Sequence, residues 1–159
     1  MLWNFFSAFR PALRDDQIAL LLSNEDVYDP ALGIDDGYTF YIHERRSRRR
    51  AGYISLRLGE SPCVYYFGHI GYHVDPPFRG RHYARRACSL LRPMIESAGK
   101  SSVVITTDPD NTPSRRTCEG LGCVLERVVD VPREIRSRWE ISEVKCRYIW
   151  RMDASLDLD

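Results

Sequence analysis

The stretch Val74-Asp75-Pro76-Pro77-Phe78-Arg79-Gly80-Arg81-His82-Tyr83-Ala84 contains the signals that decide how this chain folds. The strand before it must end at the two prolines, because proline has no N–H to donate to a sheet. From Ala84 onward, apolar residues recur at helical spacing as far as Gly99, which predicts a helix. The stretch is therefore a strand-to-helix turn that carries a glycine and several basic residues.

This turn has the features of an anion-binding site. The first backbone N–H groups of a helix have no partner within the helix, and the helix dipole is positive at that end. Arg79 and Arg81 stand beside these groups, so a pyrophosphate would fit there. On these features alone any phosphate ligand would serve, and similar turns also occur without a ligand.

The rest of the chain predicts a mixed sheet with helices packed against it. Aromatic and β-branched residues favour strands at 38–44, 51–58, 64–74, 103–107, 123–131 and 145–152. The first two of these should pair as an antiparallel hairpin. We expect helices at 15–23, 84–98 and 113–121.

Three residues mark helix boundaries or irregularities. Thr112 is the predicted N-cap of helix 113–121, with Pro113 at its first position, and Gly122 should form a left-handed cap at its end. Pro93 lies inside the preceding helix and removes one backbone hydrogen bond. That helix should therefore kink near Ser89 or end early.

Composition narrows the class of protein. The 159 residues are 43% hydrophobic, enough for one core, and we expect a single domain over 1–159. A formal net charge of +1 argues against nucleic acid or a membrane as the main partner, and the arginine run at 45–50 should be a solvated turn. Five cysteines without paired spacing suit free thiols in a reducing compartment, so we expect a cytoplasmic protein.

Two motifs resemble the GNAT superfamily of N-acetyltransferases. The family's acetyl-CoA loop reads Gln/Arg-x-x-Gly-x-Gly/Ala after a strand ending in Val-x-Pro, and the quoted stretch matches it with His82 at the middle glycine. The second motif, Asn-x-x-Ser/Ala leading into a helix that ends near Leu-Gly-Phe, corresponds to Asn111-Thr112-Pro113-Ser114 and Glu119-Gly120-Leu121-Gly122-Cys123. The resemblance spans roughly 38–131. It implies the α+β acyl-CoA N-acyltransferase fold, with a mostly antiparallel sheet splayed between strands 64–74 and 103–107.

The resemblance also implies the site. Acetyl-CoA would be the acetyl donor, without a metal, and a primary amine of a small molecule or protein would accept the acetyl group directly in a ternary complex. The pyrophosphate would bind backbone amides of Arg79, Gly80, Arg81, His82, Tyr83 and Ala84. The pantetheine arm would pair with the strand edge at Tyr72, His73 and Val74, and Asn111 and Ser114 would contact it from the other side. Such an acyltransferase would be a monomer or homodimer.

The catalytic residues are the least defined part of the resemblance. We expect His69 to be the general base, because family members often place a carboxylate or histidine facing the cleft near this point of the strand. The alternatives are His73, His43, Glu44, Glu126 or a chain of water molecules. Cys118 occupies the position where many members carry a tyrosine that protonates the departing thiolate, although a buried cysteine could equally only pack. The N–H of Val74 would polarise the thioester carbonyl.

Two other functions remain open at this stage. The same fold could serve as a non-catalytic acetyl-CoA-binding sensor module, as His82 and the missing tyrosine would allow. An RNA-binding domain that uses the run at 45–50 would lack a basic face. The cleft walls should come from segments 24–37 and 132–144, although the charged residues at 133–145 suggest a solvated excursion or a partner surface.

Overall fold

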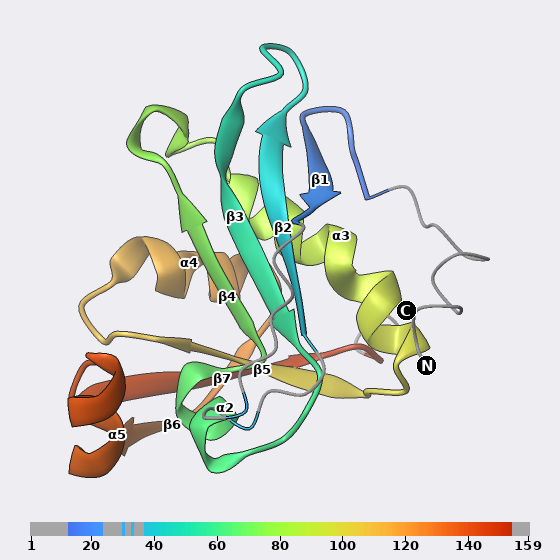
Figure 1. Ribbon diagram of the computed structural model, residues 1–159. Helices are drawn as coiled ribbons and strands as arrows, with labels where there is room; N and C mark the ends of the chain where they lie inside the picture. The colour runs from blue at the N-terminus through green and yellow to red at the C-terminus, as the bar shows by residue number, and fades with distance from the viewer. Residues whose placement is uncertain (1–12, 24–29, 31–32, 34–36, 154–159) are drawn as a thin grey trace.

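A computed structural model describes residues 13–23, 30, 33 and 37–153, and in them a seven-stranded sheet has the order β1-β2-β3-β4-β5-β7-β6 (Figure 1). The strands are β1 (Ile18–Leu22), β2 (Gly37–Glu44), β3 (Arg50–Arg57), β4 (Ile70–Val74), β5 (Ser102–Thr107), β6 (Val124–Asp130) and β7 (Val144–Arg151). The helices are α2 (Pro62–Phe67), α3 (Tyr83–Ser97), α4 (Thr112–Gly120) and α5 (Arg133–Trp139), with a 3-10 turn η2 (Pro76–Phe78). The predicted α+β class and the mostly antiparallel sheet are confirmed.

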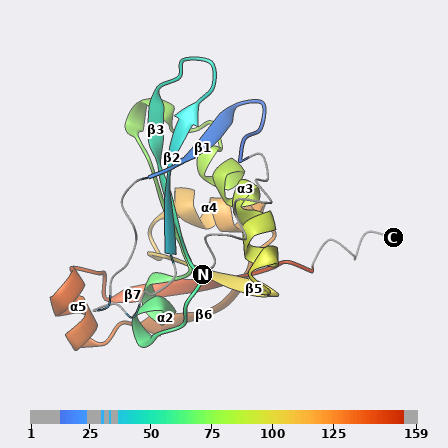
Figure 2. The ribbon, with the colours of Figure 1, turned by 45° about the vertical axis from the view of Figure 1, so that its right-hand side comes forward.

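The helices lie on both faces of the sheet. Figure 2 shows α3 and α4 on one side and α2 and α5 on the other. The core lies under α3, whose side chains Ala87, Cys88, Leu91 and Ile95 are fully buried. The helix continues through Pro93 to Ser97, so the predicted early end is wrong.

The predicted hairpin is present, but the helix expected at 15–23 is wrong. β2 and β3 pair antiparallel from Gly37↔Arg57 to His43↔Arg50. Residues 18–22 form the edge strand β1 instead of a helix. The carboxylate of Asp15 accepts hydrogen bonds from the N–H groups of Gln17 and Ile18, both at 2.8 Å, which makes a turn into a strand. So short an apolar run does not distinguish period two from the helical period.

Only the second half of the strand predicted at 64–74 is a strand. The hydroxyl of Ser61 accepts a hydrogen bond from the N–H of Val64 at 3.1 Å, and Pro62 opens α2. Gly68, at φ 77°, ends this helix. A serine cap followed by proline is a known helix start, but the aromatic run behind it had favoured a strand.

The start of α4 lies one residue earlier than predicted. Asn111 is its N-cap, and the side-chain oxygen of Asn111 accepts from the N–H of Ser114 at 3.2 Å. Thr112 is therefore the first residue of the helix, and Pro113 the second. Gly122 has φ 79°, which confirms the predicted left-handed cap.

The sheet opens between β4 and β5. β4 pairs with β3 along its length, from Gly52↔Val74 to Leu56↔Ile70, but the parallel pairing with β5 is limited to Ile70↔Ile105. Beside that pair, the N–H of His69 donates to the carbonyl of Val104 at 2.7 Å. From there the strands diverge (Figure 1), so the predicted splay is confirmed.

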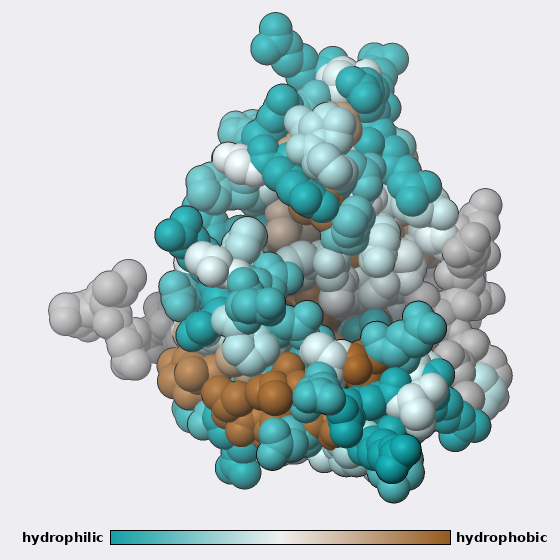
Figure 3. Space-filling view, turned by 90° about the vertical axis from the view of Figure 1, so that its left-hand side faces the viewer, coloured by the Kyte–Doolittle hydropathy of each residue, from teal (hydrophilic) through white to brown (hydrophobic). Residues whose placement is uncertain are grey.

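β6 is the edge strand at the end of the sheet opposite β1. Its side chains Val124, Leu125 and Val128 are exposed, and an apolar patch is visible low on the face in Figure 3.

Within the part of the chain that the structure describes, no helix is long and apolar enough to cross a membrane.

Candidate active site

The edge of β4 that faces the gap offers backbone groups to a ligand. Asp75 N–H donates to Ala51 at 2.8 Å and Arg57 N–H donates to His69 at 2.7 Å. Because hydrogen-bonded pairs alternate in an antiparallel ladder, the backbone groups of His73 face β3, whereas those of Tyr72 and Val74 face the gap. Two of the three residues predicted to pair with pantetheine are thus oriented for it through their backbone, and His73 is not.

The predicted phosphate loop lies at the start of α3. His82 is the N-cap, and its side chain makes no capping hydrogen bond, so the first N–H groups of the helix are left for a ligand. Gly80 and His82 both have positive φ, 79° and 59°. A left-handed backbone costs a non-glycine residue about 1–2 kcal/mol, and His82 adopts it at the position where the family pattern has glycine.

The arginine side chains of this loop are bound within the protein. Arg81 forms an ion pair with Glu44 of β2, and the Tyr83 hydroxyl donates to the same carboxylate at 2.7 Å. Hydrogen bonds from Ser47 and Tyr83, with Arg81 beside them, hold the pKa of Glu44 below its ordinary value. Arg79 Nε donates to the carbonyl of Val74 at 3.0 Å. These contacts fix the shape of the loop, so an anion would be bound mainly by backbone N–H groups.

Tyr72 connects the two sides of the gap. Its hydroxyl lies 2.8 Å from Oγ of Ser114 at the start of α4. Burial raises the pKa of Tyr72, so the hydroxyl keeps its proton at neutral pH. The sequence predicts a role only for the backbone of Tyr72, and nothing in the local sequence indicates that its side chain reaches α4.

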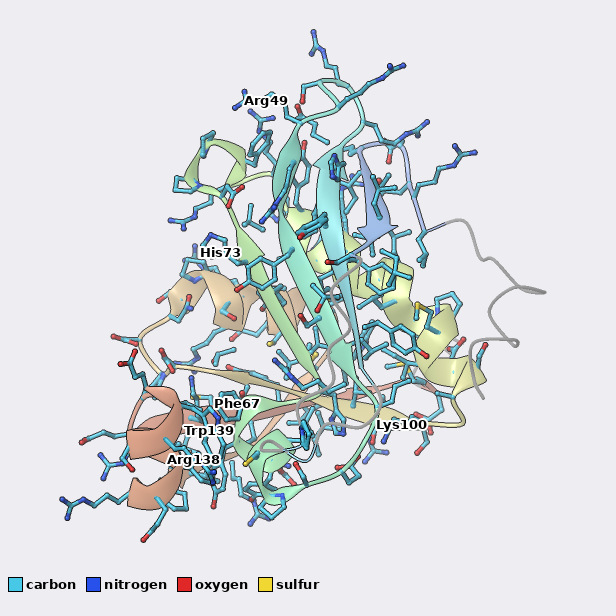
Figure 4. All side chains as sticks on the ribbon, in the orientation of Figure 1. Arg49, Phe67, His73, Lys100, Arg138 and Trp139 are labelled. Atoms are coloured by element: carbon cyan, nitrogen blue, oxygen red, sulfur yellow. The ribbon has the colours of Figure 1, made fainter. Side chains whose placement is uncertain are left out.

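A cavity of about 450 Å³ runs into the gap. Its wall combines residues of β3, β4, β5, the start of α4 and the chain from α5 to β7, including Tyr72, Asn111 and Ser114. Phe67 and Trp139 line one side of the cavity and form an edge-to-face pair, with their ring centroids 6.1 Å apart (Figure 4). The prediction that 132–144 forms a cleft wall is confirmed by residues 139–142, whereas most of 24–37 lies outside the described residues.

An ion pair forms another part of this wall. Asp108, directly after β5, accepts hydrogen bonds from Lys145 and Ser142. Burial alone would raise the pKa of Asp108, but these two partners hold it below its ordinary value. The two charges compensate each other inside the cavity.

The geometry does not support His69 as the base. Its Nδ1 accepts from the N–H of Val104 at 2.9 Å, and its Nε2 lies 2.6 Å from a carboxylate oxygen of Glu60. The ring is buried and does not line the cavity. Burial lowers the pKa of His69 in spite of Glu60, so the neutral ring acts as a link between β4 and β5.

The alternative bases are also placed by the structure. His73 is exposed, stacks on Tyr53 at 5.7 Å and lies 3.4 Å from Asp75. Glu126 is bound to Arg147 at 2.8 Å. Of these two candidate bases, His73 contacts a residue that lines the cavity, Tyr53, whereas the partner of Glu126 does not line it.

Cys118 lies in the core and not at the cavity. It is fully buried, and a hydrogen bond with Cys123, together with burial, raises the pKa of its thiol. The geometry therefore matches the packing interpretation better than a role in protonating a leaving group.

The site and the fold agree with a family comparison. The family model described as acetyltransferase (GNAT) domain matches residues 8–124, so the chain belongs to the GNAT acetyltransferase family. No curated protein shows significant similarity to the chain in sequence.

Several solved structures share the fold. An acetyltransferase from Agrobacterium tumefaciens str. C58 is 17% identical with a TM-score of 0.62, over 89% of this chain and 94% of that one. The ribosomal-protein-S5-alanine acetyltransferase of Vibrio fischeri is 20% identical with a TM-score of 0.58, over 74% of this chain and 62% of that one. The microcin C7 self-immunity acetyltransferase MccE, solved with acetyl-CoA and AMP, is 20% identical with a TM-score of 0.55, over 72% and 61%. This chain thus matches about three fifths of the length of the latter two proteins.

Proposed function

We propose that this protein is an N-acetyltransferase that passes the acetyl group of acetyl-CoA to a primary amine in a ternary complex. The observation that carries the proposal is the gap between β4 and β5, where pairing is limited to Ile70↔Ile105 and a cavity enters. An extended pantetheine arm could add to the free edge of β4 as a further strand would. The donor's diphosphate would bind the uncapped start of α3.

The N–H of Val74 would act on the thioester. It faces the gap and would donate to the carbonyl oxygen, where negative charge develops as the amine attacks. The amine nitrogen forms a bond to the carbonyl carbon, the carbon–sulfur bond breaks, and the amine loses a proton to solvent. The sulfur leaves as the thiolate of coenzyme A.

The thiolate would accept a hydrogen bond from Tyr72 and take its proton from solvent. Tyr72 lines the cavity, and its hydroxyl, whose pKa burial raises, lies 2.8 Å from Oγ of Ser114. This hydrogen bond would replace the acid that the family resemblance implies on α4, where this chain has the buried Cys118.

Acetyl-CoA binding and turnover test the proposal in two steps. At about 100 times its Kd, acetyl-CoA should raise the free energy of unfolding by about 2.7 kcal/mol. Thiol release should then follow with at least one amine of a panel. Absence of stabilisation would rule out enzyme and sensor alike, whereas stabilisation without thiol release from any amine would leave the sensor.

A proline substitution isolates the Val74 N–H. Val74→Pro removes a donor that faces the gap and leaves the ladder to β3 intact, whereas Val74→Ala keeps the donor. Loss of one such donor costs about 100-fold in turnover, so thiol release should fall in the first variant and stay near wild type in the second. Equal rates in both variants would contradict the role of this N–H.

A further inference from the structure

Arg57, the last residue of β3, lines the cavity and has no ionic partner among the described residues. Its Nη1 donates to the carbonyl of Gly68 at 3.2 Å, and its Nε is buried and has no hydrogen-bond partner in that part of the chain. Within the described part of the chain, Arg57 forms no ion pair. Burial lowers the pKa of Arg57, and Tyr53 beside it opposes this shift, but a guanidinium remains charged at any physiological pH.

A second arginine shows how the fold treats such a group elsewhere. Arg147 of β7 is buried, and it donates to Glu126 at 2.8 Å, donates to the carbonyl of Tyr65 and stacks on the Tyr65 ring at 3.6 Å. Arg57 is partly buried at the cavity, and even partial loss of water around a charge is unfavourable without a counter-charge. Among the described residues Arg57 has no such counter-charge, and a ligand in the cavity could supply one.

The guanidinium of Arg57 lies close to Gly71 of β4. A Cβ added to Gly71 would lie 3.4 Å from Nη1 and 3.5 Å from Nη2 of Arg57, which is ordinary van der Waals contact. These distances place the guanidinium against β4, the strand that borders the gap.

The other charges of the cavity do not neutralise Arg57. Asp108 is paired with Lys145, and Glu140 is exposed at the end of α5. The remaining wall near Arg57 is largely aromatic, from Tyr53, Phe67 and Trp139. Figure 4 shows Phe67 and Trp139 directed toward one another on this side of the molecule.

We propose that Arg57 binds an anionic group of the acceptor, so that the substrate is an amine that also bears a carboxylate or a phosphoryl group. The planar guanidinium can donate two parallel hydrogen bonds to either group. The acceptor's body would lie against the Phe67–Trp139 pair, with its amine toward the gap. This inference rests on the proposed acetyl transfer, because it names the acceptor of that reaction.

Matched pairs of amines test it. Glycine with glycinamide, β-alanine with β-alaninamide, and phenylalanine with phenylalaninamide compare a carboxylate with a neutral amide, and O-phosphoethanolamine with ethanolamine tests the phosphoryl group. In wild type, the anionic member of at least one pair should have a kcat/KM about tenfold higher or more, as expected for a charge-assisted contact. The pairs that show this difference identify carboxylate or phosphoryl as the preferred group.

Two variants assign the preference to Arg57. Arg57→Gln should lose it through a higher KM for the anionic amine, with the KM for acetyl-CoA unchanged, and Arg57→Lys should recover part of it. Arg46→Gln, on the exposed turn after β2, is the control and should behave as wild type. Equal use of acids and amides by wild type, or a preference that survives in Arg57→Gln, would overturn the inference.

A binding measurement separates this inference from the proposed function. N-acetylglycine, N-acetylphenylalanine and inorganic phosphate should be tested without acetyl-CoA for their effect on thermal unfolding. At least one should stabilise wild type and not Arg57→Gln, even if acetyl transfer fails, and stabilisation of both proteins alike would again contradict the inference. The unliganded Arg57→Gln protein should unfold no earlier than wild type, because the substitution removes an unpaired charge. A large loss of stability would instead show that Arg57 is structural.

Discussion

The two ends of the gap between β4 and β5 differ in their backbone contacts, although the residues that form them lie only a few positions apart. At the closed end, Gly68 and His69 bring the chain against the backbone of β5. At the open end, Tyr72 and Val74 turn their backbone groups toward space, and Arg79 covers the Val74 carbonyl. The two ends therefore depend on different contacts, and substitutions can perturb them separately.

The largest effect is expected at the closed end. A Cβ on Gly68 would lie 2.9 Å from the carbonyl oxygen of Val104 and 3.0 Å from the nitrogen of Thr106, and the positive φ adds strain. Gly68→Val should lower the free energy of unfolding by about 3 kcal/mol, measured by urea titration. Gly99→Val is the control, because Gly99 has a similar φ of 75° with nothing within 4 Å. Equal losses in both variants would mean that crowding against β5 plays no part.

A smaller effect is expected at the open end. Tyr72→Phe removes the proposed hydrogen-bond donor to the thiolate and the link to Ser114, so kcat should fall about tenfold to 100-fold, which is about 1.4–2.7 kcal/mol. The KM for acetyl-CoA should change little. Cys118→Ser, which alters the buried thiol, should leave kcat within about twofold by the same reasoning. The reverse ranking of the two variants would assign the contact with the thiolate to Cys118.

The smallest effect is a pH dependence of stability at the closed end. Because burial lowers the folded-state pKa of His69, the unfolded chain binds a proton there at a higher pH than the folded chain does. Stability from this site is present above the ordinary histidine pKa of about 6.5 and is lost as the pH falls toward the folded value, by at most about 1.4 kcal/mol per pH unit. His69→Gln should remove this part of the slope. A difference between wild type and variant that stays constant from pH 7.5 to 5.5 would contradict it.

Local signals in the sequence were sufficient for the elements that local chemistry determines. The two prolines end β4, Gly122 closes α4, and alternating residues such as Ile54 and Leu56 form the hairpin core. β1 and α2 were assigned to the wrong class because their apolar runs are short. In both cases a side-chain cap, at Asp15 and Ser61, decides the structure.

The candidate site likewise contains residues that local motifs identify and residues whose role only the folded structure indicates. The loop Arg79–Ala84 and Asn111 could be identified because each motif is contiguous, although only the structure shows that Arg81 is bound to Glu44. The environments of Arg57, Tyr72 and His69 depend on contacts between segments far apart in the chain. No pattern of neighbours in the sequence reports that a ring is fully hydrogen-bonded or that a guanidinium has no partner.

Trp139 is a natural fluorophore on the wall of the candidate active site. Trp139 is on the cavity wall against Phe67 and near Arg138, whereas Trp150 is sealed in the core. Emission from Trp150, and from Trp3 outside the described residues, would add to the signal, and a molecule entering the cavity would quench or shift the light from Trp139. Titrations could then be followed optically on the unlabelled chain, before any acceptor is known.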